Sequence, residues 1–436
     1  MNPGLVILAA ALLLYPFFFD TREGGVPVNS SHQSSLAGLN REQGSSHEFR
    51  GFDQLIPQLM RKWNLPGGAI AITKGERLVF AKGYGIADKE SSQPVFADSL
   101  FRIASVSKPI TAVAILKLHE EGKLELDAKV FRLLDNLKPL PNAKVDPRLF
   151  DISIRQLLYH SGGWDQRKSN DPMGQSREAA RAFGLPLRVG AETIIRFTIG
   201  HRLDFDPGTQ HAYSNFGYCV LGRVIEKVSG QSYQEYVREQ VLRPAGITRM
   251  QIGRTLHSER YPGEVTYYSA PGVSAGRSAL SDDRKEVPIQ YGSYFLESMD
   301  SHGGWIASAV DLVRFVAAVD GQNRRPDLLK RETIDLMTAR PEPPLWVGSP
   351  IYYAMGWNVR PVKRGAIWYH TGALAGSGLA AIVRTPGGLS WAVLFNSIPA
   401  KLSDVNPFFV KMDKAIGLAI DQVKDWPAHD LFSEYP

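Results

Sequence analysis

Apolar residues in the first quarter of the chain recur first at helical spacing and then at strand spacing. From Phe52 to Trp63 they fall on one face of a helix, in spite of Pro57 inside it. Two β-rich runs follow at 68–73 and 77–85, and the short glycine-containing connection between them is typical of a hairpin. This part of the chain therefore predicts a helix followed by two paired strands.

The last third of the chain shows the same kinds of element in the opposite order. β-rich runs cover 366–369, 378–384 and 389–395, and apolar residues then recur at helical spacing from 409 to 423. Asn406-Pro407 fits the N-cap and first position of that last helix. A hairpin and a helix at each end predict one antiparallel sheet that both chain ends build, with helices flanking it, in an α/β (α+β) fold.

The middle of the chain has a different pattern, with helices and long loops in place of strands. Ser232 and Glu235, for example, have the spacing of a capping box at the start of a helix. We expect this mostly helical part to cover one edge of the sheet, with the active site between the two parts. The predicted boundaries are 51–125 and 300–425 for the α/β part, 126–299 for the helical part, 51–425 for the domain as a whole and 426–436 for a C-terminal tail.

The N-terminal apolar segment is short for a membrane-spanning helix. Residues 5–19 are nearly all apolar, which is the length of the hydrophobic region of a signal peptide. No Lys or Arg precedes them and no small-residue cleavage site follows, so we expect residues 1–19 to be a signal peptide or an uncleaved anchor; a buried structural helix is the alternative. Residues 20–50 are predicted to be a flexible linker. The protein is thus expected to be exported, and to be periplasmic, secreted or tethered to the membrane through its N-terminus.

Composition and charge exclude several classes of function. With 44% hydrophobic and 22% charged residues, the chain has the composition of a soluble enzyme. Its formal charge of +6 comes from basic residues interspersed with acidic ones, without a basic stripe beside stacking aromatics, so nucleic acid is not expected as a partner. Cys219 is the only cysteine, which excludes an intrachain disulfide. The ten histidines lack metal-ligand spacing, so no catalytic metal is expected.

Ser105 and Lys108 stand where a polar loop gives way to the apolar run 109–116. Residues three apart are neighbours on a helix, so the hydroxyl and the amine are expected on one face of its first turn. The helix N-terminus adds partial positive charge there, and burial favours a neutral lysine. Such a serine can act as a nucleophile. The alternative is a helix-start serine with a lysine that extends to solvent, because this spacing is common by chance.

Two further motifs place polar groups at the boundaries of predicted elements. Tyr213-Ser214-Asn215 lies in a loop before an apolar helix and can present a phenol and an amide; the alternative is an Asn N-cap with a packed tyrosine. His370-Thr371-Gly372 follows the strand-like run 366–369, and its glycine permits close approach of a substrate backbone. The alternative there is a strand end with a turn glycine. Chance matches to all three motifs, in this order and at element boundaries, are rare.

The three motifs together resemble those of the penicillin-recognising serine hydrolases. The resemblance is strongest to the group of class C β-lactamases, D-alanyl-D-alanine carboxypeptidases and family VIII carboxylesterases, and it covers roughly residues 52 to 425. It implies a β-lactamase/transpeptidase-like fold. Other segments similar to this group are 154–163, 207–222, 303–312 and 353–357.

The resemblance implies an acyl-enzyme mechanism on Ser105 that needs no cofactor. Lys108 or Tyr213 would take the serine proton, and the sequence leaves open which of the two is the base. Asn215 would hold the lysine and a substrate carbonyl. The backbone N–H groups of Ser105 and, by analogy with the family, Ala373 would stabilise the oxyanion, and water would then hydrolyse the acyl-enzyme.

His370, Thr371 and Gly372 are the expected substrate-binding residues of the third motif. Dedicated β-lactamases of the group usually have a lysine where His370 stands, and a histidine is mostly neutral near pH 7. This difference favours esters or D-amino-acid amides, with weak β-lactam hydrolysis, so the expected partner is a small-molecule ester, amide or peptide substrate. The segment 164–200, which includes Asn170-Asp171-Pro172, is long for the group and is expected to line the acyl pocket or to form a lid.

Two other functions and one other nucleophile are alternatives. The functions are a D-alanyl-D-alanine carboxypeptidase or other peptidoglycan peptidase, and a non-catalytic scaffold with the same fold. The nucleophile is Ser274, because Gly272-Val273-Ser274-Ala275-Gly276 matches the serine turn of α/β-hydrolases. The residues after it are polar and predict no apolar helix, and the Gly-rich segment at His302 follows the serine, whereas it precedes the serine in those enzymes. Both observations argue against Ser274.

Overall fold

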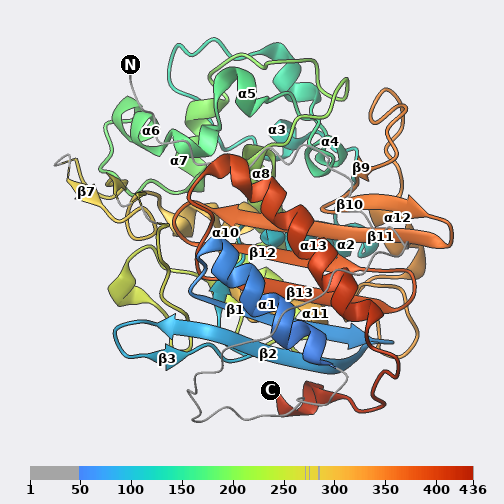
Figure 1. The fold of residues 1–436 in the computed structure, drawn as a ribbon. Helices are drawn as coiled ribbons and strands as arrows, with labels where there is room; N and C mark the ends of the chain where they lie inside the picture. Colours follow the sequence, from blue (N-terminus) through green and yellow to red (C-terminus); the bar gives the residue numbers. More distant parts are fainter. Residues whose placement is uncertain (1–48, 271, 274, 283–284, 436) are drawn as a thin grey trace.

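The two ends of the chain meet in one antiparallel sheet. The computed structural model describes residues 49–270, 272–273, 275–282 and 285–435. Strand β1 (Gly67–Lys74) pairs with β13 (Leu389–Phe395) along nearly its whole length. The prediction that both chain ends build a single sheet is confirmed (Figure 1).

The sheet contains eight strands, all paired antiparallel. β1 forms the predicted N-terminal hairpin with β2, and β13 forms a C-terminal hairpin with β12. In spatial order the strands are β3 (Gln93–Pro94), β2 (Arg77–Asp88), β1, β13, β12 (Gly378–Arg384), β11 (Gly365–Leu374), β10 (Asn358–Val362) and β9 (Tyr352–Tyr353).

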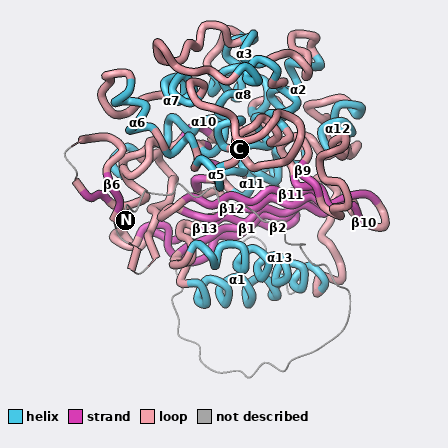
Figure 2. The backbone as a smooth tube through the Cα atoms, turned by 90° about the horizontal axis from the view of Figure 1, so that it is seen from above, coloured by secondary structure: helices cyan, strands magenta, loops and turns pink. Residues whose placement is uncertain are grey.

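Two helices from opposite ends of the chain cover one face of the sheet. α1 (Arg50–Trp63) and α13 (Val405–Asp421) lie side by side there (Figure 2). Phe52 and Ile56 of α1 and Met412 of α13 are buried in the core that they form with the sheet. The apolar stripes predicted for both helices therefore face the strands.

The start of α13 differs from the prediction. The helix begins at Val405, after Asp404, so the assignment of Asn406 as its N-cap is wrong. Pro407 lies within the first turn. A proline is tolerated there because the first N–H groups of a helix have no intrahelical partner to lose.

The other face of the sheet packs against α11 and the central helix α2 (Ser107–Glu120). Residues 107–116 of α2 are all buried, and a helix that is buried on all sides is typical of a protein interior. The mostly helical part of the chain lies on this side of the sheet, opposite α1 and α13 (Figure 2). The remaining helices are α3 (Val130–Leu133), α4 (Ile154–Leu158), α5 (Gln166–Ser169), α6 (Ser176–Ala182), α7 (Ala191–Thr198), α8 (Asn215–Ser229), α9 (Tyr233–Val237), α10 (Asp300–Gly303), α11 (Ala309–Ala317) and α12 (Arg331–Thr338).

A second, three-stranded sheet leads the chain into the first motif. Its central strand β8 (Trp305–Ala307) pairs with β4 (Phe101–Arg102) on one side and with β5 (Gln251–Ile252) on the other. A separate pair of short strands consists of β6 (Gly276–Arg277) and β7 (Glu286–Val287). Because β4 ends three residues before Ser105, this small sheet fixes the direction from which the serine enters the site.

Strand β11 runs through the third motif and is not an edge strand of the sheet. It extends to Leu374, so the predicted strand end after Tyr369 is wrong, and it lies between β12 and β10. β10 pairs with it only from Gly365 to Tyr369, whereas β12 pairs with it as far as Leu374. The half of β11 from His370 onward therefore has no strand neighbour on one side, and the turn that carries Ser105 lies against it there.

Some sequence predictions fall on residues that the structure does not describe. These are the signal peptide or anchor at 1–19, the linker as far as residue 48 and the rival serine Ser274. Within the described ranges, no helix combines the length and the apolar character that crossing a membrane requires.

Candidate active site

Ser105 lies in a single 3-10 turn, Ala104–Val106, that leads directly into α2. The serine thus precedes the helix, which corrects the prediction that it stands in the first helical turn. Ala104 has a positive φ of 47°, a conformation that is uncommon outside glycine. Strained backbone of this kind is frequent at functional sites. Ser105 is partly exposed, whereas Ala104 and Val106 on either side of it are buried.

The Lys108 amine is fully buried and has three hydrogen-bond partners. Its Nζ lies 3.0 Å from Oγ of Ser105, 2.8 Å from Oδ1 of Asn215 and 2.9 Å from the carbonyl oxygen of His302. The oxygens of Asn215 and His302 can only accept, so the amine donates a hydrogen bond to each of them. A neutral amine then keeps its lone pair for the hydroxyl proton of Ser105. These contacts suit a lysine that accepts the serine proton.

The electrostatic surroundings of Lys108 favour its neutral form. Burial holds the pKa of the amine well below its usual value, and the Asp171 carboxylate opposes this effect. Burial also raises the pKa of Asp171, against its hydrogen bonds from Asn215 and from the Met173 N–H. Burial thus favours the neutral amine, which is the form that can accept a proton.

Tyr213 brings a phenol close to the same atoms. Lys108 Nζ lies 4.8 Å from the centroid of its ring. Among the described residues its buried hydroxyl has no hydrogen-bond partner. Burial raises the pKa of this hydroxyl, and the neighbouring Ser105 side chain is the group that opposes the rise. The phenol is consequently protonated near neutral pH and can donate to a group that enters the site.

Asn215 is the first residue of α8 but not its cap. The cap is Ser214, whose Oγ accepts a hydrogen bond from the Gly217 N–H at 3.1 Å, so the alternative of an Asn N-cap is wrong. The Asn215 side chain is buried and faces the site instead. Its Oδ1 accepts from Lys108, and its Nδ2 donates to Oδ2 of Asp171 at 2.7 Å.

The contact between Asp171 and Asn215 could not be predicted from the sequence. The long segment 164–200 was expected only to line a pocket or to form a lid. Asp171 is half-buried and caps a short 3-10 turn, Pro172–Gly174, where its Oδ1 accepts from the Met173 N–H at 3.0 Å. The Asp-Pro pair indicates such a turn locally, but no sequence pattern indicates a partner 44 residues away.

His370 is fully buried within β11 and does not present a cation. Its Nδ1 lies 2.8 Å from the Thr371 carbonyl oxygen, which can only accept, so Nδ1 carries a proton. Its Nε2 then accepts from the Tyr353 hydroxyl at 3.1 Å. Burial, with a smaller contribution from Lys108, lowers the pKa of His370 to about 3. The imidazole is therefore neutral and already has both of its hydrogen bonds.

The rest of the third motif brings β11 against the serine turn. A Cβ at Gly372 would come within 3.1 Å of the Ser105 backbone nitrogen, so only a glycine fits this approach. The buried Thr371 hydroxyl has no hydrogen-bond partner within the described ranges. Ala373 follows and is partly exposed. The structure thus brings Gly372 to Ser105 and places Thr371 and Ala373 on either side of that contact along the strand.

The His160 ring packs against the Tyr213 ring, a contact that no sequence motif indicated. Its ring centroid lies 4.3 Å from that of Tyr213 and 4.5 Å from that of Tyr353. Its Nδ1 accepts from the Ser214 N–H at 3.1 Å. Burial lowers the pKa of His160 well below its usual value, so it is a neutral packing and hydrogen-bonding group.

Arg102 anchors the strand that leads into the serine turn. Its buried guanidinium donates to the carbonyl oxygens of Gln290 at 2.6 Å and Arg254 at 2.8 Å, and to the Ser377 hydroxyl at 2.8 Å. Ser377 lies in the turn between β11 and β12. Arg102 therefore ties the approach to Ser105 to the far end of the strand that carries the third motif.

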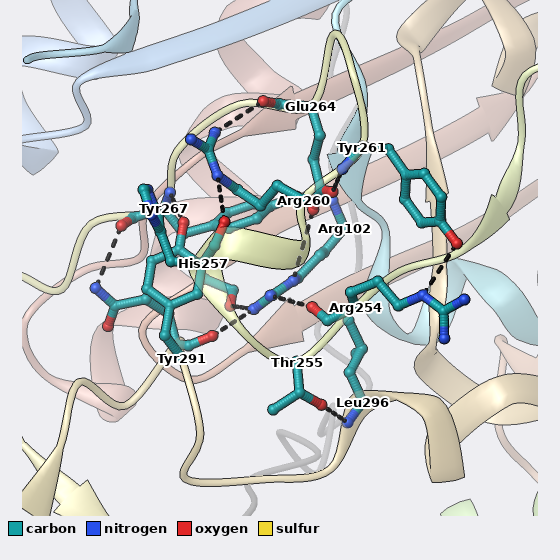
Figure 3. A network of polar contacts seen from close by, with 12 residues as sticks. Arg102, Arg254, Thr255, His257, Arg260, Tyr261, Glu264, Tyr267, Tyr291 and Leu296 are labelled. Carbon is teal, nitrogen blue, oxygen red and sulfur yellow. Dashed lines mark hydrogen bonds and ion pairs between the residues drawn. The ribbon is translucent and has the colours of Figure 1, made fainter.

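A tyrosine and a glutamate complete the surroundings of Arg102 (Figure 3). The guanidinium lies over the Tyr267 ring, 4.4 Å from its centroid. The Tyr267 hydroxyl accepts from the Arg102 backbone N–H at 2.8 Å and donates to Glu264 at 2.9 Å. Arg102 Nε and Glu264 form a fully buried ion pair at 3.9 Å. Removing either partner would leave a buried charge unpaired, so this network links the strand before the serine turn to Glu264 and Tyr267.

The chain around the rival motif does not open a helix. Gly276, the last residue of the motif, and Arg277 after it form strand β6 and pair with β7. The serine turn of α/β-hydrolases leads from a strand into a helix. The G-x-S-x-G match therefore lacks the context that would support it.

Comparisons with known proteins identify the family and the fold. A protein-family model described as "Beta-lactamase" matches residues 52–408. Among solved structures, the octameric penicillin-binding protein homologue from Pyrococcus abyssi is 26% identical, with a TM-score of 0.62 over 86% of this chain and 78% of that one. The D-amino acid amidase from Ochrobactrum anthropi SV3 is 21% identical, with a TM-score of 0.66 over 87% of this chain and 100% of that one, and shows likeness of fold.

A curated relative covers a smaller part of the chain. The probable fimbrial assembly protein FimD, serogroup H1, of Dichelobacter nodosus is 33% identical over 233 residues, which is 52% of this chain. The chain spans about half the length of the curated relatives that it matches.

Proposed function

Since the chain belongs to the beta-lactamase family, which has a serine acyl-hydrolase fold, we propose that it is a serine hydrolase that forms an acyl-enzyme on Ser105. The observation that carries this proposal is the position of the Lys108 amine, which lies 3.0 Å from the serine oxygen and 2.8 Å from Oδ1 of Asn215. A buried, neutral amine beside a partly exposed hydroxyl is the arrangement that activates a serine.

Acylation follows from the protonation states of the two groups beside Ser105. Lys108 takes the hydroxyl proton as Oγ attacks the substrate carbonyl. The backbone N–H groups of Ser105 and Ala373 stabilise the negative oxygen of the tetrahedral intermediate. Tyr213, whose hydroxyl is protonated, gives its proton to the leaving group, and the Lys108 ammonium returns a proton to the phenol. Water then attacks the acyl-enzyme, with Lys108 and Tyr213 again transferring the protons.

The proposed substrates are esters or D-amino-acid amides. In the family's lactamases a lysine of the third motif binds the substrate carboxylate, whereas His370 is neutral here and hydrogen-bonded to Tyr353. A substrate without a free carboxylate at that point is therefore favoured. Likeness of fold to a D-amino acid amidase supports the amide part of this proposal. β-Lactam hydrolysis is expected to be weak.

We also propose that the protein is exported and acts outside the cytoplasm or at the membrane surface. The apolar run of residues 5–19 supports this, as a signal peptide or as an anchor for the domain. Expression of the full chain in a bacterial host, followed by fractionation and N-terminal mass analysis, tests the idea. A protein found in the cytoplasmic fraction with its N-terminus intact would contradict it.

Covalent labelling tests the serine chemistry directly. A fluorophosphonate probe and a fluorescent penicillin are each incubated with the protein, and the labelled peptide is identified by mass spectrometry. We expect label on Ser105 that is lost in Ser105→Ala. Failure of both probes on folded protein would favour a non-catalytic scaffold.

A substrate panel then separates the hydrolase types. It consists of p-nitrophenyl esters, D-amino-acid amides, nitrocefin and a D-alanyl-D-alanine peptide. Turnover of esters or amides without release of D-alanine supports the proposal. Release of D-alanine as the fastest reaction would favour the peptidoglycan peptidase. Similarity to the Pyrococcus abyssi penicillin-binding protein homologue is the reason to include this alternative.

A further inference from the structure

We propose that Asp171 is a positioning residue that fixes the direction of the hydrogen-bond chain ending at Ser105. The proposal rests on the proposed acyl-enzyme function and deepens it. It assigns a role to a side chain that is connected to the serine through Asn215 and Lys108.

The chain of contacts has only one consistent direction. A carboxylate can only accept, so Asn215 must turn its amide NH2 toward Oδ2 of Asp171, which lies 2.7 Å away. Its amide oxygen then faces Lys108 and accepts from the amine at 2.8 Å. The second acceptor of the amine, the His302 carbonyl oxygen, is a backbone group and does not change direction. The lone pair of Lys108 is left for Ser105.

A reversed Asn215 amide would abolish this arrangement. Its NH2 group would face the Lys108 amine, which would have to accept with its single lone pair. No acceptor would then remain for the hydroxyl proton of Ser105, 3.0 Å from the amine. The two orientations have the same shape, so packing alone does not choose between them. The carboxylate of Asp171 makes the choice.

Asp171 is itself held in place on two sides. Its Oδ1 accepts from the Met173 N–H at 3.0 Å at the start of a 3-10 turn. The helix α6 follows this turn, and its Arg177 is bonded to the Ser278 carbonyl oxygen and to the Asp282 carboxylate. The carboxylate thus belongs to a segment that is held by the turn at Met173 and by the contacts of Arg177 in the helix that follows.

A capping role alone makes a different prediction from a positioning role. Asparagine caps helices about as well as aspartate, so a capping residue tolerates Asp171→Asn better than Asp171→Ala. In Asp171→Asn, however, the Met173 N–H keeps the only amide oxygen, because a backbone donor cannot turn. The amide NH2 then faces Asn215 and forces it to reverse. Asp171→Ala leaves Asn215 without this partner but does not force the reversal. The positioning role therefore predicts that asparagine is the worse substitution.

The experiment compares second-order rate constants for fluorophosphonate labelling of Ser105 in the full chain. We expect Asp171→Asn to label about 100-fold more slowly than the wild type, as misplaced reacting groups do, and Asp171→Ala only about 10-fold more slowly. The double variant Asp171→Asn/Asn215→Asp restores one donor opposite one acceptor. Its carboxylate then lies beside the Lys108 amine and raises the pKa of that amine, so the variants are compared at a pH above which the rate constant no longer rises, and there the double variant should recover most of the rate lost in Asp171→Asn. The matched control is Asp165→Asn, because Asp165 caps the neighbouring helix α5 by accepting from the Arg167 N–H at 3.0 Å. It should remain within about twofold of the wild type.

Three outcomes would overturn the proposal. The first is an alanine variant as slow as, or slower than, the asparagine variant, which would leave Asp171 as a cap. The second is a loss of hydrolysis rate in the Asp171 variants that is confined to substrates with a free amine. An amino-acid ester and a simple acetate ester are compared for this, and such a loss would assign the Asp171 carboxylate to substrate binding. The third is a double variant no faster than Asp171→Asn.

Thermal unfolding keeps this test separate from the proposed function. If wild-type Ser105 takes no label, the acyl-enzyme proposal fails, but the contact can still be tested. Asn215→Asp sets carboxylate against carboxylate, and Asp171→Asn sets amide NH2 against amide NH2. The double variant should then have a higher Tm than the sum of the two single shifts predicts. Additive shifts would overturn the contact itself.

Discussion

A Cβ atom on Gly372 would lie 2.3 Å from the carbonyl oxygen of Ile103, which is shorter than any contact that the two groups could make. Strand β11 and the turn before α2 thus approach each other as closely as two backbones can. The same Cβ would lie 3.1 Å from the backbone nitrogen of Ser105. The distance between the serine turn and the strand that carries Ala373 therefore depends on the absence of a side chain at this position.

Replacing Gly372 by alanine tests this dependence. The methyl group must push β11 away from the serine turn, which would separate the two backbone N–H groups proposed to hold the oxyanion. We expect fluorophosphonate labelling of Ser105 to slow by about 100-fold, the cost of a misplacement of roughly 1 Å. Gly387→Ala is the matched control, because a Cβ at Gly387 has no neighbour within 4 Å. Equal labelling of both variants would show that the close approach does not matter for the chemistry.

The sequence predicted the parts of this molecule that local spacing determines. The hairpin of β1 and β2, the helices at both ends and the sheet that joins them follow from apolar periodicity. The pairing of Ser105 with Lys108 follows from their separation of three residues. Each of these features depends on residues that are close together in the sequence or on a spacing that repeats along it, so one local pattern is enough to predict it.

The remaining features depend on partners far apart in the chain. Asp171 meets Asn215 across 44 residues, and His370 meets Tyr353 across 17. The strand end predicted after Tyr369 was wrong because His370 is polar yet fully buried in β11. Its imidazole is accommodated there because Tyr353 supplies a hydrogen bond, and that distant partner cannot be read from the residues beside His370.

Lys108→Met tests the assignment of the base. Methionine is close to lysine in volume and removes only the amine, so we expect labelling of Ser105 to fall by about 10²- to 10⁴-fold, the usual contribution of a general base. Lys117→Met on the same helix is the control, because the Lys117 amine is 3.4 Å from the Leu328 carbonyl oxygen and far from the motif. Unchanged labelling in Lys108→Met would assign the base to another group.

The pH dependence of labelling gives a second test of Lys108. The neutral amine is the active form, so the rate constant should fall on the acid side, as the amine gains a proton. Since the Asp171 carboxylate raises the pKa of Lys108, Asp171→Ala should move this acid limb to lower pH. An unmoved limb would contradict the assignment. The other titratable groups that face the amine are Tyr213, Tyr218, His160, His302 and His370.

Tyr213→Phe should distinguish a proton donor from a structural tyrosine. Burial raises the pKa of the phenol, so it is a donor and not a base near neutral pH. A donor matters most when the leaving group is basic. We expect kcat/KM for an amide to fall by about 100-fold or more, and that for a p-nitrophenyl ester by less than about tenfold. Equal losses on the two substrates would assign Tyr213 a role in binding or folding. Tyr236→Phe is the control, because it removes another buried hydroxyl that has no hydrogen-bond partner among the residues that the structure describes.

The buried His370 should make the protein less stable in mild acid. Burial lowers its pKa from 6.5 to about 3, so between these values the unfolded chain holds a proton that the folded chain does not. The contribution of His370 to the free energy of unfolding is therefore complete above about pH 6.5 and decreases as the pH falls toward 3. Between pH 7 and pH 5 the loss is about 2 kcal/mol.

Denaturant unfolding at the two pH values tests this role of His370. The free energy of unfolding should decrease from pH 7 to pH 5 in the wild type, and the decrease should be smaller by this amount in His370→Asn. Tyr353→Phe removes the hydrogen-bond partner but keeps the imidazole, so it should retain the decrease. If His370→Asn loses as much stability as the wild type over this range, the histidine is not held neutral by the fold, and a cationic third motif that binds substrate carboxylates becomes the better explanation of the site.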